Sequence, residues 1–184
     1  MADLKPQLAD FNWPDPFLLD TQLTEDDRML RDAAAQFAQN ELQPLIIDAY
    51  REATVNPGLF PKMGEAGLLG ATIPEEYGGL GASYTAYGLI AREVERVDSG
   101  YRSMMSVQSS LVIYPIHAYG SEAQRPKFLP CLCSGALIRC VGFTEPDAGS
   151  APAGIKTRAS KTATGHRLTG AKFCNSHAPN STPF

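Results

Sequence analysis

Apolar residues recur every three or four positions through most of residues 1–135, a spacing typical of amphipathic helices that share one core. The first such stretch predicts a helix over 24–42, with Thr24 as N-cap, acidic residues in the first turn and a stop at Pro44. Further helices are predicted over 45–50, 59–67, 83–97 and 101–119, and the last of these is kinked or restarted at Pro115. A short helix that carries Phe128 and Leu129 is predicted to follow an N-cap at Ser121. The glycine-rich residues 74–81 predict an ordered loop between helices.

The pattern changes after residue 135. Three short runs rich in strand-forming residues predict strands over 137–143, 156–160 and 166–170. The predicted fold class is therefore α+β, with an all-helical domain over 1–135 and the first strands of an incomplete β domain over 136–173. So few strands leave sheet edges and apolar faces uncovered. Residues 174–184 show neither the spacing of apolar residues typical of a helix nor that typical of a strand, which predicts a disordered tail.

Composition and charge narrow the classes of function. The 184 residues are 43% hydrophobic and 20% charged with a net charge of −4, which is ordinary for a soluble globular protein and offers no basic surplus for nucleic acid. The longest apolar run, 111–116, contains Pro115 and is far shorter than the roughly 20 residues that span a bilayer. The N-terminus has neither a secretory apolar region nor an Arg-rich presequence, so the expected compartment is the cytoplasm, or the mitochondrial matrix if a presequence has been removed.

Four cysteines invite a metal or disulfide interpretation: Cys131, Cys133, Cys140 and Cys174. Their spacing lacks the paired Cys-x-x-Cys of zinc sites, and the histidines stand at no ligand-like spacing to two sulfurs. We therefore expect reduced thiols and no metal site.

The stretch 141–150, Val-Gly-Phe-Thr-Glu-Pro-Asp-Ala-Gly-Ser, has the composition of a ligand-contacting loop. Its glycines let the backbone approach a ligand closely, Pro146 fixes one φ angle, and the hydroxyls of Thr144 and Ser150 can donate and accept hydrogen bonds. Local chemistry alone favours a β-turn without a ligand over this interpretation.

Residues 91–111 and 144–150 together resemble the acyl-CoA dehydrogenase family, with shorter matches at 63–70 and 118–122. The resemblance runs from Phe11 to Lys172 and is strongest to the members that act on glutaryl-CoA. It implies an oxidoreductase that binds FAD, removes a hydride and a proton from an acyl-CoA substrate, here glutaryl-CoA, and decarboxylates the product to crotonyl-CoA. It also implies electron-transfer flavoprotein as a partner and a homo-oligomeric assembly.

The resemblance assigns roles to particular residues. Arg102 and Ser103 match the positions that bind the far carboxylate of the substrate, a task suited to a planar guanidinium, and Ser150 would border the acyl-CoA. The alternative for Arg102 is a surface ion pair with Asp98. The residues that would line the flavin are Val141, Gly142, Phe143, Thr144, Glu145, Pro146, Asp147, Ala148, Gly149 and Ser150.

No catalytic residue is assigned within the chain. Glu145 is acidic and close to the expected flavin, but it falls in the turn and does not match the family's catalytic glutamate, whose position lies beyond these residues. Other conspicuous residues have structural interpretations: Met104 and Met105 as core, His117 as a packed histidine, and Glu93 and Glu95 as a solvated helix face.

The sequence departs from the family pattern towards its end. Ala151 stands where the family usually has Asp, and Phe173-Cys174-Asn175-Ser176 replaces the aromatic Trp-Ile-Thr (or Ser) that walls the flavin. These departures predict an incomplete chain, inactive alone, with a doubtful homo-oligomer. Two alternatives stay open: a non-catalytic fragment that docks on a full-length family member, and a dehydrogenase of another short-chain acyl-CoA.

Overall fold

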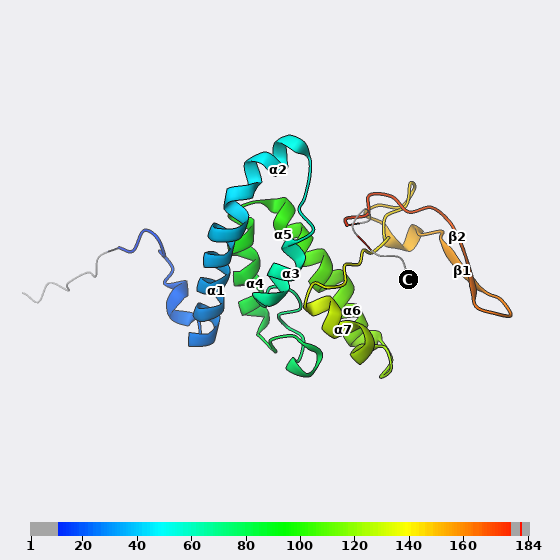
Figure 1. The fold of residues 1–184 in the computed structure, drawn as a ribbon, viewed down its shortest axis with the longest axis horizontal. Helices are drawn as coiled ribbons and strands as arrows, with labels where there is room; N and C mark the ends of the chain where they lie inside the picture. The colour runs from blue at the N-terminus through cyan, green and yellow to red at the C-terminus, as the bar shows by residue number, and fades with distance from the viewer. Residues whose placement is uncertain (1–10, 178–180, 182–184) are drawn as a thin grey trace, which may run out of the picture.

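The computed structural model describes residues 11–177 and 181, which form a helical bundle followed by a long loop and a β-hairpin (Figure 1). The α-helices of the bundle are α1 (Glu25–Phe37), α2 (Ile46–Glu52), α3 (Leu59–Glu65), α4 (Tyr84–Glu95), α5 (Ser99–Ser106), α6 (Tyr114–Tyr119) and α7 (Arg125–Cys133). Two π-helical segments, η2 (Ala38–Leu42) and η5 (Val107–Ile113), interrupt them. The hairpin consists of β1 (Arg158–Lys161) and β2 (His166–Thr169).

Helix α1 begins as the sequence predicts. The Thr24 hydroxyl accepts a hydrogen bond from the Asp27 N–H at 3.1 Å, and the Asp27 carboxylate accepts one from the Thr24 N–H at 3.2 Å, which completes a capping box. Asp27 also accepts a hydrogen bond from the hydroxyl of Ser83, the N-cap of α4, at 2.8 Å. One carboxylate thus joins the starts of the two helices with the most extensive mutual packing in the bundle.

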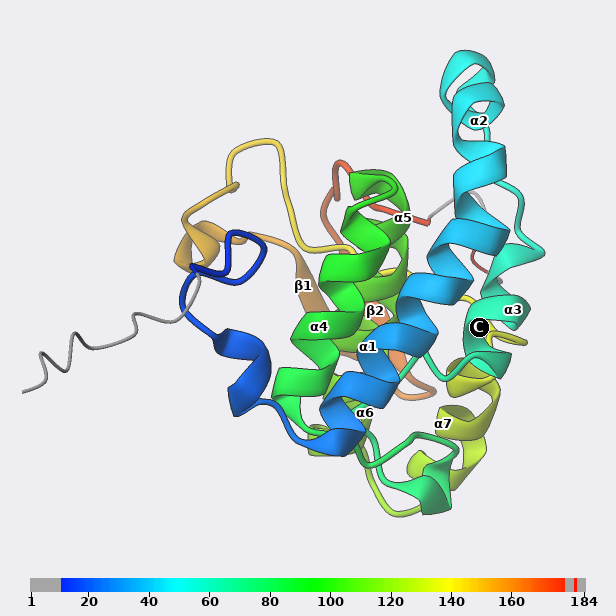
Figure 2. The ribbon, with the colours of Figure 1, turned by 90° about the vertical axis from the view of Figure 1, so that its left-hand side faces the viewer.

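The predicted stop at Pro44 is wrong. The chain stays helical through η2 and a 3₁₀ turn (Gln43–Leu45) into α2, and Figure 2 shows α1 and α2 stacked as one rod. Pro44 lies in the first positions of the 3₁₀ turn, where a missing N–H costs little. The change of hydrogen-bond pattern just before it lets the rod continue across the proline.

The core lies between α1, α3, α4, α5 and α7, and its largest fully buried side chains include Phe60, Met63 and Met105. Met104 and Met105 are buried, as expected. Glu93 contradicts the prediction of a solvated face, because it is only 4% exposed. Its carboxylate accepts hydrogen bonds from the guanidinium groups of Arg92 and Arg96, which stay near the surface. Ionic partners that reach in from the surface let an acidic side chain occupy an apolar helix face.

The predicted helix over 101–119 is confirmed as the continuous run of α5, η5 and α6, with Pro115 in the first turn of α6. The sequence predicts Ser121 as the N-cap of α7, but the residue before that helix is Gln124. The side-chain oxygen of Gln124 accepts a hydrogen bond from the Ser121 N–H at 2.9 Å.

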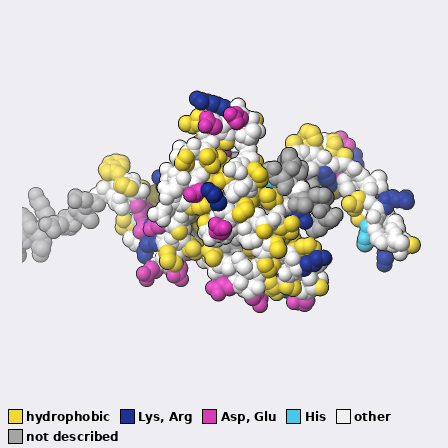
Figure 3. All heavy atoms as spheres, viewed as in Figure 1, with side chains coloured by type: hydrophobic (Ala, Val, Ile, Leu, Met, Phe, Trp, Pro, Cys, Tyr) yellow, Lys and Arg dark blue, Asp and Glu magenta, His cyan; other side chains and the backbone are white. Residues whose placement is uncertain are grey.

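The hairpin confirms two of the three predicted strands, with β1 starting two residues later than expected. The strands pair antiparallel with Arg158 opposite Thr169, and all eight of their residues are exposed. The hairpin extends away from the bundle as a separate lobe, as Figure 3 shows. The predicted strand over 137–143 is wrong, because this segment forms no strand and its polar backbone groups pair elsewhere.

The N-terminal segment carries apolar side chains that face solvent. Phe11 and Trp13 make an edge-to-face contact with centroids 4.7 Å apart, yet Trp13 is 83% exposed, and Phe17 and Leu19 are exposed as well. Figure 3 shows this cluster at the N-terminal end of the bundle.

Within the described residues, no helix is both long and apolar enough to cross a bilayer.

Two helical glycines make a matched stability test. A Cβ at Gly64 in α3 would lie 2.3 Å from the carbonyl of Ser134, whereas a Cβ at Gly88 in α4 would meet nothing within 4 Å. We expect Gly64→Ala to lower the free energy of unfolding by about 1–3 kcal/mol through overpacking. Gly88→Ala should raise it by about 0.5–1 kcal/mol through helix propensity. Urea unfolding measures both, and equal effects would show that the α3–Ser134 contact is not formed.

Candidate functional site

The loop 141–150 is organised around a tight turn. The backbone N–H groups of Glu145 and Ala148 each donate to the other residue's carbonyl, at 3.0 and 3.1 Å. Pro146 and Asp147 form the exposed corner, and Lys156 reaches back to the Asp147 carboxylate at 3.1 Å. The turn that the sequence predicts is therefore present.

Glu145 fastens this turn to the segments that follow. Its carboxylate accepts hydrogen bonds from the backbone N–H groups of Lys156 (2.7 Å) and Thr157 (2.9 Å) and from the Lys172 ammonium (3.0 Å). The adjacent Thr157 side chain, these N–H donors and the Lys172 ammonium hold the pKa of the Glu145 carboxyl at about 2. The side chain is buried and its carboxylate holds the loop through these bonds, while its predicted contact with a flavin stays a prediction.

Gln108 places the start of the loop. This side chain is fully buried in η5, and its amide donates to the carbonyls of Leu132 (3.2 Å) and Leu137 (2.7 Å) while its oxygen accepts from the Arg139 N–H (3.2 Å). These hydrogen bonds replace the backbone hydrogen bonds to a neighbouring strand that a strand over 137–143 would need. The sequence carries no distinct signal for this role, because Gln108 lies among the polar residues Ser106, Ser109 and Ser110.

A cavity of about 330 Å³ lies between the loop and η5. Its wall consists of Val107, Leu111, Val141, Phe143, Thr144, Cys174 and Ser176. The Thr144 carbonyl accepts from the Phe173 N–H at 2.9 Å, while its hydroxyl has no hydrogen-bond partner among the described residues. Of the ten residues predicted to line a flavin, three line this cavity, and the other seven, Ser150 included, do not.

Arg102 is held by partners other than the predicted one. Its Nε donates to Glu95 Oε2 at 2.6 Å and its Nη1 to the Ser106 hydroxyl at 3.2 Å. Asp98 instead caps α5 by accepting from the N–H groups of Gly100 and Tyr101, so the Arg102–Asp98 surface pair is wrong. Nη2 of Arg102 has no partner among the described residues.

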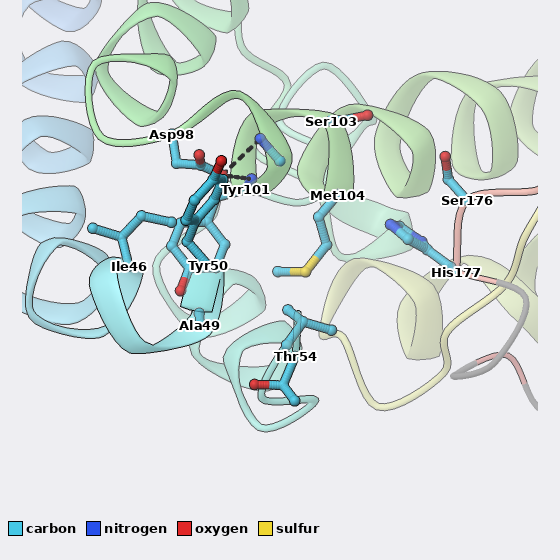
Figure 4. Close-up of a pocket in the computed structure, with 12 residues that line it drawn as sticks. Ile46, Ala49, Tyr50, Thr54, Asp98, Tyr101, Ser103, Met104, Ser176 and His177 are labelled. Atoms are coloured by element: carbon cyan, nitrogen blue, oxygen red, sulfur yellow. Dashed lines mark hydrogen bonds between the residues drawn. The ribbon is translucent and has the colours of Figure 1, made fainter. Parts of the chain in front are cut away.

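Ser103 belongs to a different cavity from the 330 Å³ one. A space of about 450 Å³ lies between α2, α5 and the chain after residue 173 (Figure 4). Ser103, Met104, Tyr101 and Tyr50 are among its lining residues, and Arg102 is not. Of the two predicted carboxylate-binding residues, only Ser103 therefore lines this cavity.

Residues 174–177 are ordered against the bundle, so the prediction of a disordered tail is wrong for them. The His177 ring packs edge-on against Phe60 with centroids 5.1 Å apart. Burial lowers the pKa of His177, against a smaller opposing effect of the Arg139 backbone. Except for Ser181, the remainder of the predicted tail lies outside the described residues.

The other candidate residues have structural surroundings. His117 packs edge-on against Tyr77 at 5.9 Å. All four cysteines are free thiols, and burial raises the pKa of Cys133 to about 11. Among the residues that the structure describes, no cluster of three His, Cys, Asp or Glu side chains is arranged to hold a metal ion.

Comparison with known proteins gives a consistent result. Residues 24–136 match the family model of the acyl-CoA dehydrogenase N-terminal domain. The chain is 34% identical over 161 residues to a mitochondrial isovaleryl-CoA dehydrogenase of Pongo abelii, covering 86% of this chain and 38% of that protein. Its fold matches a glutaryl-CoA dehydrogenase of Mycobacterium smegmatis at a TM-score of 0.85 and 40% identity, covering 89% and 42% of the two chains. A structure of such an enzyme from that organism in complex with FADH2 matches at a TM-score of 0.86 and 38% identity, covering 90% and 42%.

This chain thus spans about two fifths of the length of the relatives it matches. The family model covers more than half of the chain, including all the α-helices, and the fold agrees. The chain therefore belongs to the acyl-CoA dehydrogenase family.

Proposed function

We propose that this chain forms part of an FAD-dependent acyl-CoA dehydrogenase whose substrate is a dicarboxylyl thioester, glutaryl-CoA. The observation that carries the proposal is the 330 Å³ cavity between the loop and η5, which combines apolar walls with the unpartnered Thr144 hydroxyl. Ligand pockets of about 300–1,000 Å³ share this design, a mainly apolar lining with few directing polar groups.

The residues of the cavity fit part of a flavin. Val107, Leu111 and Phe143 supply apolar contact for a planar ring, while the Thr144 hydroxyl can bond to a polar ring edge. When bound, FAD would supply the acceptor for the hydride that leaves the acyl β-carbon. The protein's part is to place that cofactor and the substrate, and the bonds of Glu145 and Gln108 make this end of the site rigid.

Arg102 supports the choice of a dicarboxylyl substrate. Glu95 accepts from Nε and Ser106 from Nη1 of its guanidinium, which leaves Nη2 to donate to a carboxylate. The Ser99 hydroxyl donates to the second oxygen of Glu95 at 2.5 Å, which fixes Glu95 in turn. Neither Ser103 nor Ser150 shares one of the two cavities with Arg102. Their predicted contacts with the substrate therefore rest on the resemblance alone.

Proton abstraction needs a base that this loop does not supply. Glu145 is ionised to about pH 2 and all its described partners are donors, so it has little tendency to accept a further proton. We therefore expect no turnover by this chain alone.

Flavin binding by the full chain tests the cofactor part of the proposal. We expect FAD fluorescence to be quenched on binding, and Thr144→Val to weaken binding by roughly tenfold through loss of one hydrogen bond. Thr169→Val, on the exposed hairpin, is the matched control and should bind as the wild type does. Wild-type protein that leaves FAD free in equilibrium dialysis would overturn the proposal.

The variant Arg102→Lys tests the choice of substrate, by calorimetry of acyl-CoA binding. With flavin bound, calorimetry should show glutaryl-CoA affinity falling about tenfold or more, because lysine cannot bind a carboxylate bidentately. Butyryl-CoA affinity should be unchanged, and Arg96→Lys should affect neither. Equal losses for the two thioesters would favour the alternative, a dehydrogenase of another short-chain acyl-CoA.

The exposed apolar cluster of the N-terminal segment favours the other alternative, docking on a full-length family member. Co-purification of the tagged chain with such a protein, and its loss in Trp13→Ser, would support this role. Electron-transfer flavoprotein as a partner follows from the resemblance and belongs to the proposal, as does a cytoplasmic or mitochondrial-matrix location, which follows from the N-terminal sequence.

A further inference from the structure

The two cavities described above are neighbours along one helical run. Ser103 and Met104 on α5 line the 450 Å³ cavity, and Val107 and Leu111 on η5 line the 330 Å³ cavity. Ser176 lines both, so the chain segment 174–177 lies on this run between them. Figure 4 shows the His177 ring pointing from this segment towards Met104.

The segment adopts an unfavourable conformation. Cys174 and His177 have φ angles of 52° and 67°, a left-handed region that residues other than glycine rarely adopt. Both ring nitrogens of His177 are buried and make no hydrogen bond of normal geometry among the described residues, although the Arg139 backbone lies close enough to oppose part of the lowering of the ring's pKa. Strain and an unsatisfied buried polar group both weaken the docked state.

Few contacts oppose this cost. His177 packs on Phe60, its carbonyl accepts from the Ser181 N–H at 2.9 Å, and the Phe173 N–H bonds to Thr144. The titratable groups that share the cavity with His177 are Asp98 at the start of α5, Tyr101 within it, and Tyr50 from α2. The Asp98 carboxylate is already occupied by backbone N–H groups and makes no hydrogen bond to the imidazole.

We propose that residues 174–177 are a removable partition: with His177 docked on Phe60 the two cavities are separate, and when His177 withdraws they join into one groove along Ser103, Val107 and Leu111. In that groove an acyl group and a flavin could share one space. The partition regulates the site of the proposed function and in that respect rests on it.

Protonation should open the partition. A charged imidazole is unfavourable in this buried site, which lowers the pKa of docked His177 below its usual value. Docking is then fully favoured above the pKa of the released ring, about 6.5, and is lost as the pH falls below it.

Methionine methyl NMR tests this without any cofactor. Met104 lines the cavity beside His177, whereas Met63 and Met105 are fully buried in the core and serve as references. Between pH 7.5 and 5 we expect the Met104 signal to shift with an apparent pKa below about 6.5 while the references stay fixed. His177→Phe, which keeps an edge-on aromatic contact with Phe60, should abolish the shift, and His177→Asp should give the released position already at pH 7.5.

A Met104 signal that does not titrate, or that titrates equally in His177→Phe, would overturn the partition. Should His177→Asp unfold, the references would move too, and the comparison of wild type with His177→Phe still decides. The FAD titration separates this inference from the proposed function. Flavin binding without titration of the Met104 signal would support the cofactor role and overturn the partition. Titration of the Met104 signal without flavin binding in any variant would support the movement of residues 174–177 and overturn the cofactor role.

Discussion

Gln108→Leu should lower the free energy of unfolding by about 3 kcal/mol or more, although leucine has nearly the same volume as glutamine. The substitution removes the hydrogen bonds of Gln108 to the Leu137 carbonyl and the Arg139 N–H and its weaker bond to the Leu132 carbonyl, which keeps the Gly135 N–H as a donor at 3.2 Å. Each unsatisfied buried group costs about 1–3 kcal/mol. Urea unfolding followed by circular dichroism measures the loss.

Gln39→Leu is the matched control, because Gln39 lies in the other π-helical segment, η2, and is exposed. Its effect should stay within about 0.5 kcal/mol. Hydrogen exchange at Arg139 adds a local measurement, since this amide loses its acceptor only in Gln108→Leu. Equal stability of the two variants would show that the segment 137–139 is not held by Gln108.

Glu145→Gln should loosen the loop 141–150 and leave the helical bundle intact. A neutral amide keeps one acceptor oxygen, but its NH₂ group must face either the Lys156 N–H, which bonds to Oε2, or the Thr157 N–H and the Lys172 ammonium, which bond to Oε1. We expect exchange of the Lys156 and Thr157 amides to accelerate roughly tenfold or more. Asp147→Asn removes the same charge at the exposed corner of the same turn and should leave both amides protected.

The pH dependence of this protection has a definite sign. The pKa of Glu145 is lowered from 4.5 to about 2, so its contribution is complete above about 4.5 and is lost as the pH falls towards 2. The protection factors of the Lys156 and Thr157 amides should therefore begin to fall near pH 4.5 in the wild type and continue to fall towards pH 2. Protection that stays constant over this range would contradict the hydrogen bonds assigned to the carboxylate.

Much of the helical bundle could be predicted from the sequence. The helix starts at Thr24 and Ser83, the buried pair Met104 and Met105, and the position of the hairpin follow from local signals. Capping residues, apolar spacing and strand propensity act over a few residues, so the chain records them directly. Family membership was equally readable, because the motifs over 91–111 and 144–150 are contiguous.

The partners of the polar side chains were decided by the tertiary structure alone. Gln108 bonds to a carbonyl 29 positions away, Glu145 to an amide 12 positions away, and His177 packs on Phe60 from another part of the chain. The burial of Glu93 likewise depends on how helices dock. Local periodicity specifies which face of a helix is apolar. It does not specify which distant group will meet a buried donor or acceptor, because that choice is made only when the whole chain packs.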